Sequence, residues 1–377
     1  MPETKDTPIR YAVVGLGHIA QVAVLPAFFN AENSTLTALV SSDEVKLAKL
    51  GARYEVGSRH RYRYEDYDKL LEDDLVDAVY IALPNHLHHD YVTRSAEAGL
   101  HVLCEKPLGV TAEECQEMVE VCEENDVQLM TAYRLHFEEA NLEAINTARR
   151  GDIGEPRFVQ ASFSQNVKPG DIRLEPLEKG GGTIYDMGIY CINAARYLFG
   201  DDPTEVVAFS ESKTGDERFS DCDEMTTAIL RFPRNRIASF TTSFGAWETS
   251  TYRLVGTQGE IVLDPAFGYA TNLAYELHAG DKSAGRTLEK RDQFAPELIY
   301  FSECIRRNSH PEPDGYEGWG DVQIIEAIYE SAATGQPVQL DVVEPPKRPD
   351  VNQIITRPGF GKPDEIGASG PKDWDGQ

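Results

Sequence analysis

Lys106 lies at the end of a segment that otherwise has the composition of a buried strand. The apolar run His101–Cys104 is followed by Glu105 and Lys106, and then by Pro107, which has no N–H group for a strand ladder and fixes its own φ. In an open parallel sheet, ligands bind outside the carboxyl ends of the strands near the point where the strand order reverses. We therefore expect Glu105 and Lys106 to face a bound ligand, with Pro107 stiffening the strand end.

A second pair of reactive side chains follows three glycines in the segment GGGTIYDMGIY. Asp186 and Tyr190 are four residues apart, which places them on one face of a helix. Taken alone, this spacing favours a structural interpretation, namely a core-facing tyrosine and a solvated aspartate.

A dinucleotide-binding pattern opens the chain. The order Gly15-x-Gly17-x-x-Ala20 follows a predicted strand and begins a predicted helix. Gly15 permits the tight turn, Gly17 lets the backbone approach a pyrophosphate, and Ala20 allows close packing of helix against strand. His18 and Ile19 lie at the start of this helix, where backbone N–H groups bind phosphate. We expect both to contact the cofactor.

The residues after the second predicted strand indicate which dinucleotide binds. NAD-binding folds usually present an acidic residue there, whereas this chain offers Ser41 and Ser42, with Lys46 and Arg61 further on. Hydroxyl groups and cations suit the 2′-phosphate of NADP. The alternative is that these are solvated surface charges, because Asp43 lies close enough to weaken the argument.

The segment LPNHLHH ends another predicted strand. Pro84 and Asn85 lie at the strand end, and His88 follows with two further histidines. A metal site is disfavoured because no acid or thiol stands at a suitable spacing. We expect Pro84, Asn85 and His88 to lie near the cofactor.

Strands and helices alternate up to about residue 133, which predicts an α/β, doubly wound parallel sheet of the Rossmann type. From residue 134 the pattern changes to alternating strands joined by turns, which predicts an α+β domain with a large, mainly antiparallel open sheet over 134–341. Residues 342–377 are rich in Pro and Gly and are expected to form an extended tail.

The chain is strongly acidic, which bears on the ligands it can bind. Asp and Glu number 63 against 36 Lys and Arg, a formal net charge of −27 over 377 residues, which disfavours nucleic-acid binding. Such acidity suits a salt-rich, halophilic cytoplasm, although a generically acidic enzyme is the alternative.

No apolar run is long enough to span a membrane and no signal peptide is evident, so we expect a cytoplasmic protein. The six scattered cysteines are expected to be reduced thiols in the core.

These motifs in this order resemble the glucose–fructose oxidoreductase, inositol dehydrogenase and rhizopine-catabolism family, abbreviated Gfo/Idh/MocA. The resemblance rests on the Gly-rich turn, ALPNHLHH, Glu105-Lys106-Pro107, YRLHF and GGGTIYDMGIY, and it covers about residues 9–341. Inositol-type members carry His where this chain has Tyr190. The resemblance therefore implies the aldose-oxidising branch, which includes glucose–fructose oxidoreductase and NADP-dependent D-xylose 1-dehydrogenases.

The family implies oxidation of an aldose at C1 to the aldonolactone, with NADP as cofactor and D-xylose as the leading substrate. Tyr190 would be the base, Lys106 would stabilise its anion and hold the sugar, and Asp186 would bind the sugar or orient the lysine. Arg134 and His136 are expected as further sugar contacts, with a structural role as the alternative.

Two other functions stay open at this stage. One is an aldose–ketose oxidoreductase that keeps NADP bound, and the other is a non-catalytic, sugar-sensing regulator. The open face of the second sheet needs cover, which predicts a homotetramer or a homodimer.

Overall fold

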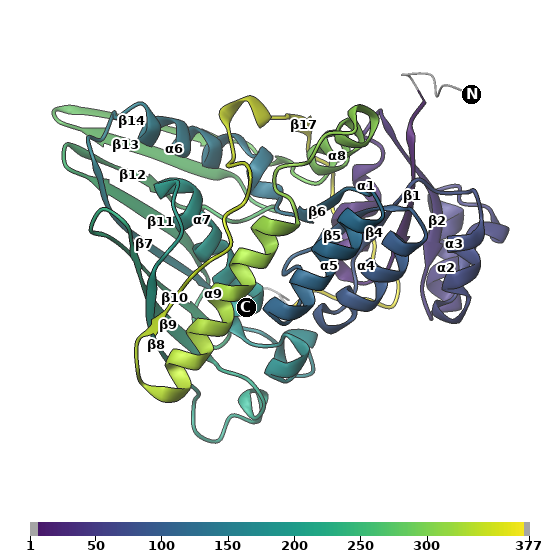
Figure 1. Ribbon diagram of the computed structural model, residues 1–377, viewed down its shortest axis with the longest axis horizontal. Coiled ribbons are helices and arrows are strands. Elements are labelled where there is room, and N and C mark those ends of the chain that lie inside the picture. Colours follow the sequence, from purple (N-terminus) through teal and green to yellow (C-terminus); the bar gives the residue numbers. More distant parts are fainter. Residues whose placement is uncertain (1–6, 373–377) are drawn as a thin grey trace.

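The computed structural model describes residues 7–372, and two sheets divide it (Figure 1). The first sheet has six strands in the order β3-β2-β1-β4-β5-β6, and all its pairs are parallel. The strand order reverses between β1 and β4, so a ligand-binding crevice is expected outside the carboxyl ends of these strands. The strands are β1 (Ile9–Val14), β2 (Ser34–Val40), β3 (Arg61–Tyr62), β4 (Ala78–Ile81), β5 (His101–Glu105) and β6 (Leu129–Ala132).

Short helices join these strands. The helix predicted after the Gly-rich turn forms as a π-helical turn, Ala20–Val24, followed by α1 (Leu25–Ala27). Thr111 and Glu114 form a capping box at the start of α5: the Thr111 side chain accepts from the Glu114 N–H, and the Glu114 carboxylate accepts from the Thr111 N–H. The other helices are α2 (Glu44–Arg53), α3 (Tyr67–Glu72), α4 (His88–Glu97) and α5 (Ala112–Glu124).

The second sheet has nine strands in the order β14-β13-β12-β11-β7-β10-β9-β8-β16. All neighbours pair antiparallel except β7 and β10, so the predicted fold class is confirmed. The strands are β7 (Pro156–Ser164), β8 (Glu205–Glu211), β9 (Met225–Phe232), β10 (Arg236–Ser243), β11 (Thr249–Gly256), β12 (Gly259–Leu263), β13 (Leu273–Ala279), β14 (Lys282–Leu288) and β16 (Val338–Gln339).

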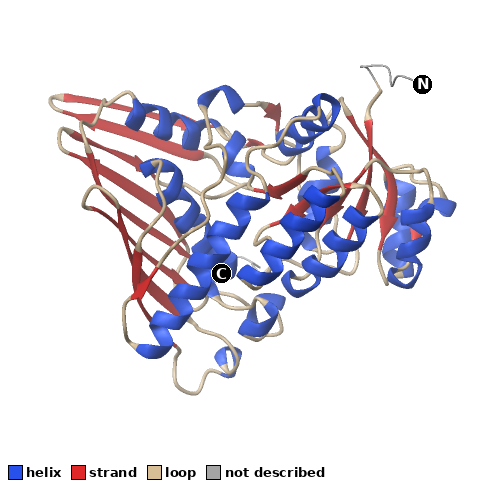
Figure 2. Ribbon diagram, viewed as in Figure 1, coloured by secondary structure: helices blue, strands red, loops and turns tan. Residues whose placement is uncertain are grey.

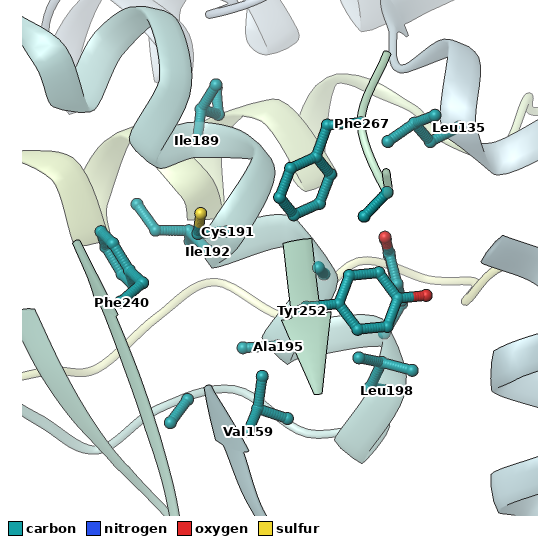
Figure 3. Close-up of a cluster of buried hydrophobic side chains, with 14 of the residues drawn as sticks. Leu135, Val159, Ile189, Cys191, Ile192, Ala195, Leu198, Phe240, Tyr252 and Phe267 are labelled. Atoms are coloured by element: carbon teal, nitrogen blue, oxygen red, sulfur yellow. The ribbon is translucent and has the colours of Figure 1, made fainter. Parts of the chain in front are cut away.

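Helices α6 (Glu139–Arg149), α7 (Ile189–Phe199) and α9 (Gly315–Thr334) cover one face of this sheet (Figure 2). Apolar side chains of α7 pack against inward-facing residues of the strands, among them Phe240 and Tyr252 (Figure 3). The opposite face exposes Phe158, Ile229 and Ile237 on the adjacent strands β7, β9 and β10. This second face carries these exposed apolar side chains and is uncovered in the single chain.

Helix α8 (Ala295–Arg307) packs on the first sheet although it follows the second in sequence. The Tyr11 hydroxyl in β1 is hydrogen-bonded to that of Ser302 in α8 at 2.8 Å, and Leu298 and Phe301 join the same core. A division of the chain at residue 134 therefore does not follow the packing, because α8 returns to complete the dinucleotide-binding half.

The structure also bears on membrane spans, cysteines and metal ligands. No helix among them is long and apolar enough to cross a membrane. All six cysteines are unpaired and buried, as predicted. No cluster of three or more potential metal ligands occurs in residues 7–372.

Candidate active site

The Gly-rich turn after β1 has the shape of a phosphate cradle. Gly15 has φ +95°, and a Cβ built on it would lie 2.4 Å from the Ala82 carbonyl oxygen, so only glycine fits this close approach of two strand ends. A Cβ on Gly17 would meet nothing within 4 Å. The helical segment that follows begins at His18 and continues as the π-helical turn from Ala20, so the N-terminal end of a helix lies next to this turn. These residues fit a dinucleotide pyrophosphate.

The residues after β2 separate into structural and exposed groups. The Asp43 carboxylate caps α2 by accepting from the N–H groups of Val45 and Lys46, which removes it as a competitor for the ribose. Ser41 is buried and its hydroxyl accepts from the Asp43 N–H at 3.2 Å, while Ser42 is exposed. Ser42 and Lys46 are therefore the groups that can meet a 2′-phosphate.

Arg61 does not fit its predicted role as a cofactor ligand. Its Nε and one terminal nitrogen donate to the Val56 carbonyl at 2.9 and 2.6 Å, and its side chain packs against Gly51 of α2. The guanidinium ties the α2–β3 connection together, which a sequence pattern of clustered cations does not reveal.

Lys106, Asp186 and Tyr190 meet where β5 approaches the second half of the chain. Lys106 Nζ donates to the Asp186 carbonyl oxygen at 2.7 Å and lies 3.2 Å from Asp186 Oδ1. The same nitrogen lies 4.9 Å from the centre of the Tyr190 ring. A π-helical turn, Ile184–Gly188, precedes α7 and presents Asp186 to the lysine. The three predicted catalytic residues are thus brought together.

Arg173 completes this cluster, and sequence reasoning missed it. Its Nε donates to Asp186 Oδ2 at 2.7 Å from a short 3-10 turn, Ile172–Leu174, that has no periodic sequence pattern. Burial alone would raise the pKa of Asp186, but Arg173 and Lys106 lower it to about 2. Asp186 is therefore an anion that fixes the lysine at the strand end.

Arg134 supports Tyr190 instead of standing free for substrate. One terminal nitrogen donates to the Tyr190 hydroxyl at 3.2 Å and to the Phe267 carbonyl at 2.5 Å, and the other donates to the Gln293 side chain. Only 5% of Arg134 is exposed. The predicted sugar contact is corrected to a hydrogen-bond donor behind the tyrosine.

His136 and His88 are held in the protein interior. His136 Nδ1 lies 2.7 Å from Glu312 Oε1 and its Nε2 lies 2.8 Å from Asn193 Oδ1, so neither nitrogen is free for a sugar. His88 Nδ1 lies 2.9 Å from the Pro107 carbonyl oxygen and its Nε2 lies 3.0 Å from that of Leu83. Burial lowers the pKa of His88. The predicted sugar contact of His136 is wrong. His88 joins the ends of β4 and β5, and its place near the cofactor stays a prediction.

The remaining predicted residues lie at the carboxyl ends of β1, β4 and β5. Pro84 precedes a 3-10 turn after β4, and the Asn85 amide donates to the Gly180 carbonyl at 2.7 Å, which links the two halves of the chain. Glu105 accepts from the Tyr80 hydroxyl at 2.9 Å. Burial raises the pKa of Glu105, and Lys106 partly offsets this. His18 and Ile19 lie at the start of the helix after the Gly-rich turn.

A dinucleotide cradle facing a lysine, a tyrosine and an aspartate defines a dinucleotide-dependent oxidoreductase. Two protein-family models match the chain. The model of an oxidoreductase family with an NAD-binding Rossmann fold matches residues 9–133, and that of the GFO/IDH/MocA C-terminal domain matches residues 142–262. The chain belongs to the Gfo/Idh/MocA oxidoreductase family.

Similar proteins include enzymes of sugar oxidation. The chain is 35% identical to a D-xylose 1-dehydrogenase [NADP(+)] of Haloarcula marismortui, over 89% of this chain and 94% of the relative. It is 33% identical to a D-xylose 1-dehydrogenase (NADP(+)) of Haloferax volcanii, over 88% of this chain and all of the relative. The crystal structure of an aldose–aldose oxidoreductase from Caulobacter crescentus, complexed with glycerol, has a TM-score of 0.85 at 36% identity, covering 88% of this chain and all of that one.

Proposed function

We propose that this protein oxidises an aldose at C1 to the aldonolactone with NADP, and that D-xylose is the leading substrate. The observation that carries the proposal is the cluster of Lys106, Asp186 and Tyr190 at the carboxyl end of β5, in the crevice that begins at the Gly-rich turn. The two archaeal relatives named as NADP-linked D-xylose 1-dehydrogenases support both the cofactor and the sugar. Exposed Ser42 and half-buried Lys46 support NADP over NAD independently of them.

Tyr190 is the base in this proposal. An ordinary tyrosine side chain titrates near pH 10, so it accepts a proton at neutral pH only where positive charge stabilises its anion. Lys106 lies over its ring, and Arg134 donates to its hydroxyl oxygen. These two cations stabilise the Tyr190 phenolate, which takes the proton of the C1 hydroxyl and thereby becomes a neutral phenol.

Asp186 and Arg173 set the position of the lysine. The Asp186 carboxylate is held by Arg173 on one oxygen and faces Lys106 on the other. Lys106 is thereby aimed at the space beside Tyr190, where it can hold a sugar hydroxyl. NADP⁺, when bound, supplies the acceptor for the hydride that leaves C1.

The proposal is tested by following NADP reduction with a panel of pentoses and hexoses in molar KCl. The expected result is multiple turnovers with D-xylose preferred, and a lower kcat/KM with NAD. Lack of NADP reduction with every aldose would contradict the proposal and favour the sugar-sensing alternative. Reduction of no more than one equivalent of NADP with a single sugar would favour an oxidoreductase that keeps its cofactor.

We also propose that the active form is a homo-oligomer in which the open face of the second sheet is covered by another subunit. Phe158 and Ile237 are register partners on β7 and β10 and are 38% and 49% exposed, next to Ile229 at 45%. An isologous contact between two such faces would bury them, giving a dimer or a tetramer. The cytoplasmic location stays a prediction of the sequence.

A further inference from the structure

The segment 360–372, here called the strap, lies along the Gly-rich turn although it is the last part of the described chain. Gln21, in the first helix, accepts from the Ile366 N–H at 2.7 Å and donates to the Ile366 carbonyl at 3.0 Å. The Glu365 carboxylate lies 2.7 Å from His18 Nδ1. The strap is thus fixed to the two residues that flank the start of the predicted pyrophosphate site.

The strap then reaches the second half of the chain. The Lys168 N–H donates to the Pro371 carbonyl at 3.0 Å, Lys168 Nζ donates to the Ser369 hydroxyl at 2.7 Å, and Lys372 pairs with Glu248 at 2.6 Å. The strap therefore bridges the two walls of the crevice.

The strap also passes the 2′-phosphate end of the predicted cofactor site. A Cβ built on Gly367 would lie 3.3 Å from Lys46 Cε and 3.4 Å from Asp43 Oδ2, and one on Gly370 would lie 3.1 Å from the His18 ring. The backbone of the strap thus comes close to the first half of the chain at two places, one at Lys46 and the other at His18 beside the Gly-rich turn.

Space remains beneath the strap. A Cβ built on Gly17 would have no other atom within 4 Å. A cavity of about 170 Å³ also lies between the first helix, a loop of the second half and the strap, with His18, Val22, Tyr269, Phe360 and Lys362 among its walls. The strap therefore leaves space open beside Gly17 and beside His18.

We propose that the strap closes over NADP after it binds and slows its release. This inference rests on the proposed use of NADP and adds that cofactor exchange requires the strap to open. The docking is built into the fold, because Gln21 is fully buried and its side chain makes two of its hydrogen bonds to Ile366. An undocked strap would leave that buried amide without these partners. The strap lies beyond both matched family models, the second of which ends at residue 262.

The first test compares the full chain with a variant that ends at Gly359. This variant retains β17 (Arg357–Pro358) and its pairing with β15 (Arg291–Asp292), so the earlier part of the tail stays anchored. NADPH is bound without sugar, displaced with excess NADP⁺, and its release is followed by stopped-flow fluorescence. We expect release at least about tenfold faster in the shortened protein, together with a higher Kd.

A second pair of variants keeps the chain length and its charge. Ile366→Pro removes the backbone N–H that donates a hydrogen bond to Gln21. Ile366→Ala removes the same side chain but keeps that N–H. We expect Ile366→Pro to release NADPH several times faster than Ile366→Ala. NADP should also protect the strap of the full chain from limited proteolysis.

Three results would be decisive against these inferences. Equal release rates in the full and shortened chains would overturn the role of the strap. A lower Kd after shortening would overturn it as well, since the strap would then compete with NADP. Failure of NADPH to bind either protein would contradict the proposed function itself.

Discussion

The Arg134 guanidinium donates a hydrogen bond to the Tyr190 hydroxyl across 3.2 Å, from the 3-10 turn that follows β6 to the first turn of α7. The contact joins the two halves of the chain at the proposed base. Arg134 is held by Gln293 and Phe267 as well, so its position is set independently of any substrate. The tyrosine therefore has a fixed donor at its oxygen and a lysine beside its ring.

Replacing the base or the lysine should abolish most of the activity and leave the fold intact. Loss of a general base typically lowers the rate by about 10²–10⁴-fold, so we expect kcat to fall by this factor in Tyr190→Phe and in Lys106→Met. Circular dichroism and thermal unfolding check the fold. Tyr316→Phe, which removes an exposed hydroxyl bound to Glu123, is the control. A near-normal kcat in either active-site variant would refute the assignment.

Lys46 should decide between NADP and NAD. A hydrogen bond to a charged group contributes about 1.5–3 kcal/mol, so Lys46→Ala should raise the KM for NADP about 10–100-fold and change that for NAD little. Lys49→Ala removes an exposed lysine from the same helix and is the matched control. Equal loss with both cofactors would show that Lys46 does not meet the 2′-phosphate.

Local patterns predicted the first sheet because its strands and helices alternate along the chain and the Gly-rich turn marks the end of its first strand. Lys106 was predicted for the same reason, since a charge after an apolar strand marks a strand end. His136 was misassigned because its partners, Glu312 and Asn193, are 176 and 57 residues away in sequence. Arg173 was missed because its loop has no periodicity, and only the fold brings it to Asp186.

The His136–Glu312 pair should make stability depend on pH on the alkaline side. Burial alone would lower the pKa of His136, but the Glu312 carboxylate raises it to about 9 from 6.5. A raised pKa in the folded state means that this stabilisation is fully present below pH 6.5 and is lost as pH rises through 9.

The change is measured by urea unfolding across this pH range. A shift of this size corresponds to about 3 kcal/mol of unfolding free energy. In Glu312→Gln the decline of the unfolding free energy with rising pH should be largely absent, because the side chain that pairs with His136 no longer carries a charge. An equal decline in the variant and the wild type would exclude this pair as its source.

Charges on the open face of the second sheet should dissociate the oligomer. Ile229 and Ile237 lie on neighbouring strands, so the double change to Lys places two like charges in the proposed contact. We expect light scattering to give a multiple of the 42.0 kDa subunit for the wild type and a smaller species for the variant. Val45→Lys, at a 55% exposed position on the first half, is the control and should not change the mass. A wild-type mass of a single subunit would refute the proposed interface.

The net charge of −27 should make the protein more stable as salt is added. Like charges repel in the compact native state, and the expanded unfolded chain partly relieves that repulsion. Added KCl weakens it because the Debye length falls from about 10 Å at 0.1 M to about 3 Å at 1 M. We expect the Tm to rise steadily into the molar range.

Cofactor affinity need not follow the same curve. NADP is an anion, so its attraction to Lys46 is screened by the same salt that screens its repulsion by the acidic surface. Thermal unfolding and NADPH binding are therefore measured on the same KCl series, from about 0.1 to about 2 M, which spans these screening lengths. A Tm that stays flat or falls over this range would mean that the acidic surface is not an adaptation to salt, and the expectation of a halophilic enzyme would be withdrawn.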